Sequence, residues 1–383
     1  MSFTGFTTNT DVKVENSIIV CHNDGHQEIL RCYDRVMEFE DDNIKTVNRR
    51  GCHLAGLGRY GEAVKYYDRV IKIDPGLKEG WYNKGSSLAS MGKYEEALEC
   101  YNRVLELDPY NLEALKTKAI ILVNLKRYNE AVACFYHALN MDSKDINLWN
   151  NLGSALDELG RYEEAINSYN RILEIDNKNI MALNNRGVAL INLCKYEEAI
   201  KCFDTVLDIN PAFKEAFFNK GTVLYYQDKY DDSIVYFNKA LECAPKDMKV
   251  LSNKGSALSC TGKYEEALTC FDMMLQAGYE SPDLWFNRGC VLASMNKYEK
   301  AFECFDTSLS MDSSIHKKAL GYYEEQLKKK PFSSNIWYCK GLILYYQGNY
   351  TSAVTCADKV IEYDCNNKRG ISLKEIAMQK NLE

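Results

Sequence analysis

The sequence predicts an all-α protein built as a solenoid of antiparallel helix pairs, and three observations support this prediction. Small residues recur at a constant interval along most of the chain, as from Gly51 to Gly85 and from Gly221 to Gly255. A leucine stands three residues and a tyrosine nine residues after each of them. Several of the units also place a proline at one constant distance after the small residue, as Pro109 follows Gly85. A fixed period of this kind is typical of repeat architectures, in which each unit packs only against its neighbours.

The recurring small residue is numbered here as position 8 of each unit. Position 11 is then always leucine and position 17 always tyrosine, while position 20 is small and position 24 is aromatic in all but the last unit. Positions 4, 8 and 11 share one face of a helix, as do positions 20, 24 and 27. Each unit is therefore predicted to be two helices that pack through these faces. Position 8 is occupied by Gly51, Gly85, Ala119, Gly153, Gly187, Gly221, Gly255, Gly289 and Gly341.

The repeats define the expected order of elements. Residues 44–315 are predicted to hold eight tandem repeats, and residues 334–367 a ninth. Residues 1–43 are expected to combine a flexible start with a degenerate capping repeat, because apolar residues still occupy core positions one period earlier. Residues 368–383 are expected to form a C-terminal capping helix that covers the apolar end of the solenoid.

An extra stretch, residues 316–333, interrupts the period before the last repeat. In this stretch Ala319, Tyr323 and Pro331 match positions 20, 24 and 32 of a repeat, without a first helix ahead of them. Residues 316–333 are therefore predicted to form an inserted single helix that offsets or bends the solenoid. An alternative is that they continue the preceding helix.

The pattern resembles the tetratricopeptide repeat, a helix pair of about 34 residues with W, L, G, Y, A, F and P at these places. The resemblance covers residues 44–315 and 334–367, about four fifths of the chain. It implies a right-handed superhelix in which the first helices line a concave surface. Two departures recur, since position 7 is usually Lys or Arg where the family prefers leucine, and position 11 is leucine where tyrosine is common.

Composition argues against several classes of protein. A net charge of −7 and an isoelectric point near 5.5 argue against a nucleic-acid binder, which usually carries a basic stripe. No apolar run approaches the ~18–20 residues that a membrane span needs. The stretch SIIVC near the start is shorter than the core of a secretory signal. The chain is therefore expected to bind neither nucleic acid nor membrane.

The placement of the cysteines indicates that they are reduced. Six of the fifteen cysteines occupy position 23 of successive units. Equivalent positions on stacked helices lie about 8–10 Å apart, whereas a disulfide needs Cα atoms within about 7 Å. We interpret them as reduced packing residues of a cytoplasmic protein. They are Cys100, Cys134, Cys202, Cys270, Cys304 and Cys356.

No residue pattern predicts a catalytic, metal or cofactor site, and we expect no enzyme activity. The five histidines share no triad or metal-ligand spacing, and the chain has neither a phosphate loop nor a GxSxG motif. The cluster CHNDGH at residues 21–26 could bind a metal through its two histidines. A turn in the capping repeat is the simpler interpretation.

A column of asparagines is the best candidate for a binding site. Position 6 lies on the side of the first helix that faces away from its partner helix. A side-chain amide offers one acceptor and two donors, so a column of amides can bind the backbone of an extended peptide. This arrangement resembles the asparagine ladder in the repeat domain of O-linked N-acetylglucosamine transferase, whose catalytic part has no counterpart here. The alternative is a set of solvated polar residues. The column consists of Asn83, Asn151, Asn185, Asn219, Asn253 and Asn287.

Aromatic residues near the asparagines suggest a site for an apolar side chain. Phe218 and Tyr226 are predicted to contribute to it. The open alternative is that such rings pack between neighbouring first helices.

Position 7 carries Lys or Arg in every repeat except one, and position 25 of the second helix carries Asp or Asn in most. A charge in an otherwise apolar stripe must reach solvent or find a partner. We predict contacts between these two positions, within or between repeats. A solvated basic column is the alternative.

Taken together, these features predict a non-enzymatic protein–protein interaction scaffold without a cofactor. Its partner is expected to be a protein or peptide bound as an extended segment along the concave groove. The alternative is a regulatory or assembly subunit that docks an enzyme or complex through its convex surface or its ends.

Overall fold

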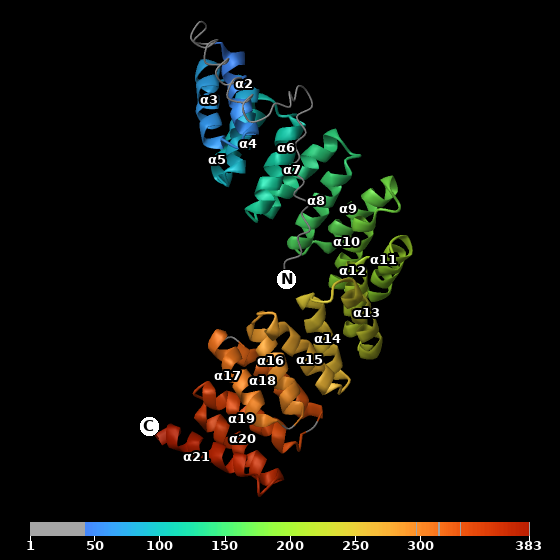
Figure 1. Ribbon diagram of the computed structural model, residues 1–383, viewed down its shortest axis with the longest axis vertical. Coiled ribbons are helices and arrows are strands. Elements are labelled where there is room, and N and C mark those ends of the chain that lie inside the picture. The colour runs from blue at the N-terminus through green and yellow to red at the C-terminus, as the bar shows by residue number, and fades with distance from the viewer. Residues whose placement is uncertain (1–42, 296, 313–314, 330, 383) are drawn as a thin grey trace. The chain divides into compact units, whose positions relative to one another are not determined.

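The computed structural model describes residues 43–295, 297–312, 315–329 and 331–382. Within these ranges it contains twenty α-helices and no strand (Figure 1). The first helices of the repeats are α2 (Ile44–Gly56), α4 (Lys78–Ser90), α6 (Leu112–Asn124), α8 (Ile146–Glu158), α10 (Ile180–Asn192), α12 (Lys214–Tyr226), α14 (Met248–Cys260), α16 (Pro282–Ser294) and α19 (Ser334–Tyr346). The second helices are α3 (Tyr60–Ile73), α5 (Tyr94–Leu107), α7 (Tyr128–Met141), α9 (Tyr162–Ile175), α11 (Tyr196–Ile209), α13 (Tyr230–Cys243), α15 (Tyr264–Gln276), α17 (Tyr298–Met311) and α20 (Tyr350–Tyr363). Two helices stand outside these pairs, α18 (Ile315–Lys329) and α21 (Lys368–Leu382). This confirms the predicted all-α fold of helix pairs.

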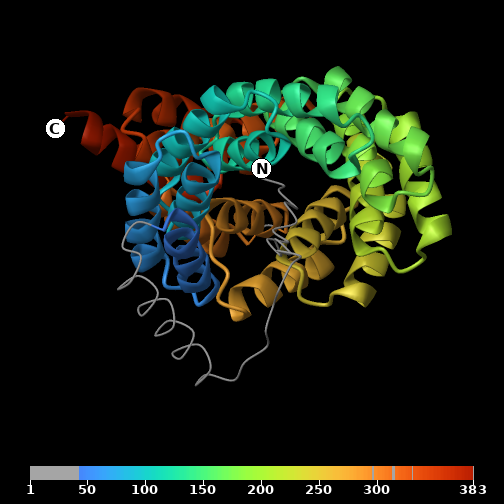
Figure 2. The same cartoon turned by 90° about the horizontal axis from the view of Figure 1, so that it is seen from above.

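The chain divides into two compact units between Cys202 and Phe203, within α11. The N-terminal unit contains α2 to α10, and the C-terminal unit contains α12 to α21. In each unit the two helices of a repeat pack against each other, and the second helix also packs on the first helix of the next repeat. Figure 2 shows these successive pairs side by side from a second direction. Each unit is thus a stack in which contacts are made between neighbours along the chain.

The repeat core depends on a small residue that faces a buried ring. At Gly153 an added Cβ would lie 2.6 Å from the ring of Tyr169, and at Gly255 it would lie 2.6 Å from the ring of Phe271. Both rings are almost completely buried. Because no side chain separates the two helices here, their backbones approach closely and the ring fills the space beside them. The predicted roles of positions 8 and 24 are therefore confirmed.

The inserted segment forms a separate helix. α17 ends at Met311, and Asp312 has an extended backbone at φ −150° and ψ 106°, so α18 does not continue α17. α18 packs against α16, α17 and α19. Its Tyr323 lies edge-on against Phe305 with 6.1 Å between ring centroids, and its Tyr322 lies edge-on against Phe286 at 6.2 Å. The aromatic side of α18 thus joins the core of the last repeats.

The C-terminal helix α21 packs on α19 and α20 through its buried residues Leu373 and Ala377. Its opposite side leaves Ile371 and Met378 exposed at 39% and 49%. The predicted capping repeat and the cluster CHNDGH lie outside the described residues. All thirteen cysteines within the described ranges are free thiols, and most of those at position 23 are buried.

Candidate interaction surface

The first helices expose one side of each repeat to solvent. Positions 2 and 13 form most of this side, with position 9 joining them in α2, α4 and α6, and we call it the first-helix face. On α4 these positions are Glu79, Ser86 and Ser90, and all three are exposed. On α12 the corresponding Glu215 and Tyr226 are also exposed. Positions 4, 8 and 11 lie on the opposite side of the same helices and face their partners, as the helical period requires.

The asparagine column lies at the edge of the first-helix face. Five of its six residues are half-buried, and Asn219 is buried at 9% exposure. Two of the amides bond to the preceding first helix. The Nδ2 of Asn83 donates to Oδ1 of Asn48 at 3.2 Å, and Nδ2 of Asn185 donates to Oδ1 of Asn150 at 3.2 Å. In these two repeats position 6 therefore contributes to the contact between neighbouring repeats.

Three members of the column keep their amide groups available. The side chains of Asn151, Asn253 and Asn287 make no hydrogen bond to any residue in the described ranges. In the repeat before Asn253, position 5 is Phe218, which offers no acceptor. A half-buried amide without a protein partner must bond to water or to a ligand, because burying it unpaired is costly. These three residues are the part of the column that is best placed for binding.

The two predicted aromatic residues have different surroundings. Phe218 is half-buried and lies against Phe237 with 6.1 Å between ring centroids, so it packs within its own repeat. Tyr226 is 49% exposed and lies edge-on against Tyr225, which in turn rests on Tyr230 at 5.3 Å. Only Tyr226 presents a large ring surface to solvent.

Repeat 9 contains the same tyrosine arrangement. Its sequence YYQGNY matches YYQDKY of repeat 6 at the end of the first helix. Tyr346 is 44% exposed and lies 5.3 Å from Tyr345, which contacts Tyr350 at 5.4 Å. In each motif two further rings lie behind one exposed ring.

The predicted contact between position 7 and an Asp or Asn at position 25 is confirmed at four of the eight cations, and Lys340 makes the equivalent contact with Glu324 of α18. Each pair joins position 25 of a second helix to position 7 of the next helix along the chain. Lys84 contacts Asp68 at 2.6 Å, and Arg288 contacts Asp272 at 2.9 Å. We call this series of contacts the ladder, and we include the equivalent contacts made by α18 and α21. The remaining contacts join Arg186 to Asn170, Lys220 to Asp204, Lys340 to Glu324 and Lys374 to Asp358.

The exceptions are of two kinds, and the prediction is wrong for Lys118 and Lys254. Leu152, which replaces the cation, stands at the ladder spacing from Tyr136, which replaces the acid. Lys118 and Lys254 stand at the same spacing from asparagines, and within the described ranges they make no ladder contact. Burial acts to lower the pKa of Lys84, but the bond to Asp68 outweighs it and leaves that pKa raised. The ladder cations therefore belong to the scaffold.

One half-buried acid was not predicted. Asp157 on α8 occupies position 12, where other repeats carry small, apolar or tyrosine residues. Its Oδ2 accepts a hydrogen bond from the hydroxyl of Tyr169 at 2.7 Å, while its buried Oδ1 has no partner in the described structure. Burial raises the pKa of Asp157 to about 7. The signal in the sequence that could have identified Asp157 is that it is the only charged residue at position 12 of the repeats. Its bonded neighbour is a structural tyrosine of the core, so we assign it no catalytic role.

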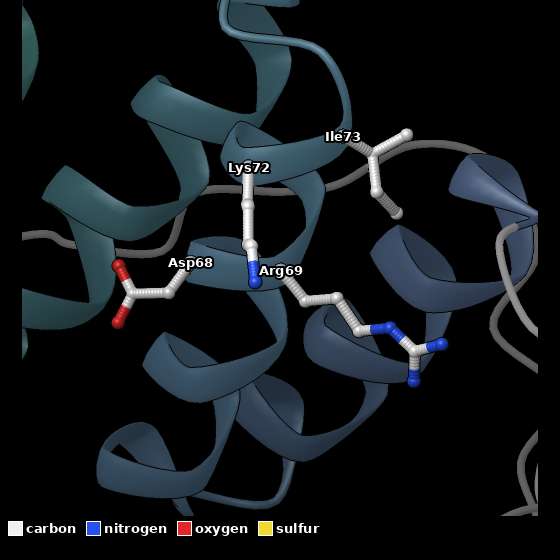
Figure 3. A pocket seen from close by; sticks show the side chains of 4 residues that line it. All are labelled: Asp68, Arg69, Lys72 and Ile73. Carbon is white, nitrogen blue, oxygen red and sulfur yellow. The ribbon is translucent and has the colours of Figure 1, made fainter.

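Two further findings concern the described residues alone. A shallow depression on α3 is lined by Asp68, Arg69, Lys72 and Ile73 (Figure 3). Asp68 in this group is held by Lys84 of the ladder. Within the described ranges, no group of three or more His, Cys, Asp or Glu residues could hold a metal ion. None of the described helices is long and apolar enough to span a membrane.

Comparison with known families identifies the same kind of repeat along most of the chain. Family models described as tetratricopeptide repeat match residues 45–77, 79–111, 110–178, 180–213, 215–247, 236–269, 282–314 and 334–367. They leave residues 315–333, which contain α18, unmatched. No curated protein sequence matches the chain significantly.

Several solved structures are similar to the chain. A tetratricopeptide repeat protein from Parabacteroides merdae is 24% identical with a TM-score of 0.54, and the match covers 61% of this chain and 93% of that one. YrrB, described as a TPR protein with an unusual peptide-binding site, is 25% identical with a TM-score of 0.42, covering 48% and 95% of the two chains. A structure of Naa15/Naa10 bound to HypK-THB is 15% identical with a TM-score of 0.44, covering 93% and 63%.

Proposed function

Because the chain belongs to the tetratricopeptide repeat family, we propose that it is a non-enzymatic scaffold that holds an extended segment of a partner protein on its first-helix face. Its repeats are those of protein–protein interaction scaffolds. The observation that supports the finer proposal is the set of available amides at Asn151, Asn253 and Asn287. They lie beside the exposed positions 2 and 13, where a peptide backbone would find both donors and acceptors.

The proposal assigns different roles to members of one column. Asn253 and Asn287 would bond to the backbone of the bound segment, whereas Asn83 mainly joins two helices of the scaffold. Phe218 would pack beneath the first-helix face against Phe237, and Tyr226 would contact the bound segment directly. The free thiols favour a reducing compartment, so we propose a cytoplasmic location. No cofactor, nucleic acid or membrane is part of the proposal.

A second candidate function rests on the other side of the repeats. Position 30, near the end of the second helix, exposes an apolar residue in several repeats, including Leu107 at 37% and Ile175 at 46%. A recurring row of apolar side chains could dock a protein through the second helices. The chain would then serve as an assembly or regulatory subunit, and its first-helix face would not take part.

Two double variants separate these functions. Asn253→Ala with Asn287→Ala removes available amides, and Leu107→Glu with Ile175→Glu places charges on the second helices. Each variant and the wild type would be purified with its partners from the native cell and compared by quantitative mass spectrometry. The proposed function predicts that only the asparagine variant loses partners. Loss confined to the glutamate variant would favour the second candidate. Asn83→Ala, with its amide engaged in the scaffold, is the matched control and should retain its partners.

A further inference from the structure

Two exposed tyrosines stand at the ends of one row on the first-helix face. In the C-terminal unit, position 13 is Tyr226 on α12, Cys260 on α14, Ser294 on α16 and Tyr346 on α19. Tyr226 is 49% exposed and Tyr346 is 44% exposed. The two residues between them are small and are also exposed. The row therefore has a large ring at each end and only small side chains in between.

The helices that carry this row form one continuous stack. α12 contacts α14, and α14 contacts α16. The hydroxyl of Tyr225 lies 4.0 Å from Sγ of Cys260, so α12 meets α14 at the level of the row. α18 bridges the last step, because it packs against both α16 and α19, and its Tyr322 lies 6.2 Å from Phe286 of α16 between ring centroids.

This stack sets the distance between the two rings. Neighbouring helices lie about 8–10 Å apart, so three to four steps separate the rings by about 25–40 Å. An extended chain advances about 3.3–3.6 Å per residue. A bound segment therefore needs about seven to twelve residues to reach from one ring to the other.

The surroundings of the two rings indicate what they can bind. Tyr226 meets Tyr225 at an interplanar angle of 69° with centroids 6.1 Å apart, and Tyr346 meets Tyr345 at 85° and 5.3 Å. In such edge-on contacts the electron-rich face of one ring meets the electron-poor edge of another. The exposed part of each outer ring offers a ligand ring the same kind of contact. An aromatic side chain gains this attraction in addition to apolar burial.

The available amides of the C-terminal unit lie between the two rings. Asn253 is on α14 and Asn287 is on α16, the two first helices between α12 and α19. Position 6 lies about two turns before position 13 on the same helix. A segment that reaches from one ring to the other therefore passes both amides. In the N-terminal unit, position 13 carries no aromatic residue.

We propose that the partner segment carries two aromatic side chains about seven to twelve residues apart, one packing on Tyr226 and the other on Tyr346. Asn253 and Asn287 hold the backbone between these two anchors. Two linked contacts bind more tightly than either alone, because the second forms at a high effective concentration once the first is made. This inference rests on the proposed peptide-binding function.

The test uses the full chain and a randomised peptide library long enough to span both rings. Peptides that bind the immobilised protein are sequenced, and one of them is labelled and titrated. We expect aromatic residues to be enriched at two positions with the stated spacing. Replacing either anchor with alanine should weaken binding about fivefold. A peptide in which the two aromatic residues are adjacent should bind only as well as a peptide with one anchor.

Two variants assign each anchor to its ring. Tyr226→Ala should remove the effect of replacing one anchor and leave the effect of replacing the other, and Tyr346→Ala should do the reverse. Tyr279→Ala is the matched control, because its ring is 44% exposed in the same unit but lies in the loop between α15 and α16. It should leave both effects as they are. Circular dichroism and thermal melting establish that each variant is folded.

The outcomes distinguish this inference from the proposed function. Selected peptides without two spaced aromatic residues, or anchors whose replacement has the same effect in wild type and in both tyrosine variants, would overturn the inference and leave peptide binding intact. Equal weakening by Tyr279→Ala would also overturn it, because the rings would then act only as general apolar surface. A library that yields no binding peptide at all would contradict both.

Discussion

In the N-terminal unit each of the second helices α3, α5, α7 and α9 is followed by the first helix of another repeat. In the C-terminal unit, by contrast, the second helix α17 is followed by the inserted helix α18. In the regular unit Lys84 contacts Asp68 and Arg186 contacts Asn170 between repeats, while Leu152 and Tyr136 replace both partners with uncharged residues. Lys118 faces Asn102 at the same spacing and makes no ladder contact in the described structure. In the interrupted unit none of the described cations contacts Asp306. The comparison shows that the insertion changes the ladder on both of its sides, because Asp306 has Tyr322 at the ladder spacing and Lys340 bonds to Glu324 of α18.

The largest expected change in stability comes from a variant that weakens the packing of the inserted helix in the C-terminal unit. Tyr323→Ala removes a buried ring that holds α18 against α17, and should destabilise that unit by about 4 kcal/mol. Because each unit is held by its own neighbouring contacts, the N-terminal unit should keep its stability. Hydrogen exchange measured by mass spectrometry would show faster exchange confined to the helices after α16. Equal acceleration in α4 to α9 would contradict the separation into units.

Tyr169→Ala in the N-terminal unit is the matched variant for this experiment. Its ring is buried against Gly153 in the same way as rings in the C-terminal repeats, and its loss should accelerate exchange in α8 and α9 instead. If both variants destabilised the same helices, the two units would unfold as one, and the comparison between them would have to be abandoned.

A smaller expected change is a pH-dependent stability of the N-terminal unit that comes from Asp157. Burial raises the pKa of Asp157 from its ordinary value of 3.8 to about 7, so between these values the folded chain binds a proton that the unfolded chain does not. The resulting stabilisation is complete below about pH 4 and is lost as the pH rises through about 7. Asp157→Asn should remove this dependence and stabilise the N-terminal unit at pH 8 by on the order of 2 kcal/mol, allowing for its partial exposure.

The measurement is urea unfolding of wild type and Asp157→Asn at several pH values between 4 and 8. The difference in free energy of unfolding should grow with pH over this range. A constant difference would mean that the carboxyl of Asp157 has an ordinary pKa in the folded protein. Asp176→Asn, at an exposed position after α9, should leave the pH dependence as it is.

The smallest expected change in stability comes from the loss of a single ladder contact. Lys84→Met breaks one contact in the N-terminal unit and Arg288→Met breaks one in the C-terminal unit. Each should cost about 0.5–1 kcal/mol at low salt, because the pairs are only half-buried, and less at high salt. Lys118→Met, at a ladder position without a contact, is the control. Equal losses in all three variants, measured by thermal melting at two salt concentrations, would show that the ladder adds no stability.

The sequence allowed the repeat, the helix pairs and the ladder partners to be predicted, because each follows from a fixed spacing along the chain. Glycine at position 8 and a ring at position 24 need only the helical period to be placed against each other, as at Gly153 and Tyr169. The candidate site was only partly predictable. Whether an asparagine of the column is available depends on what the preceding first helix offers it, and Asn83 and Asn253 differ for that reason.

The amino-acid sequence by itself therefore determined the architecture of this protein and the side of the helices on which a ligand could lie. Only the tertiary structure decided which side chains on that side are already bonded, and which ladder contacts form beside the inserted helix. The physical reason is that period and polarity are properties of a single helix. A hydrogen bond or an ion pair between repeats depends on the distance between two helices, which is set by the packing of the residues beneath them.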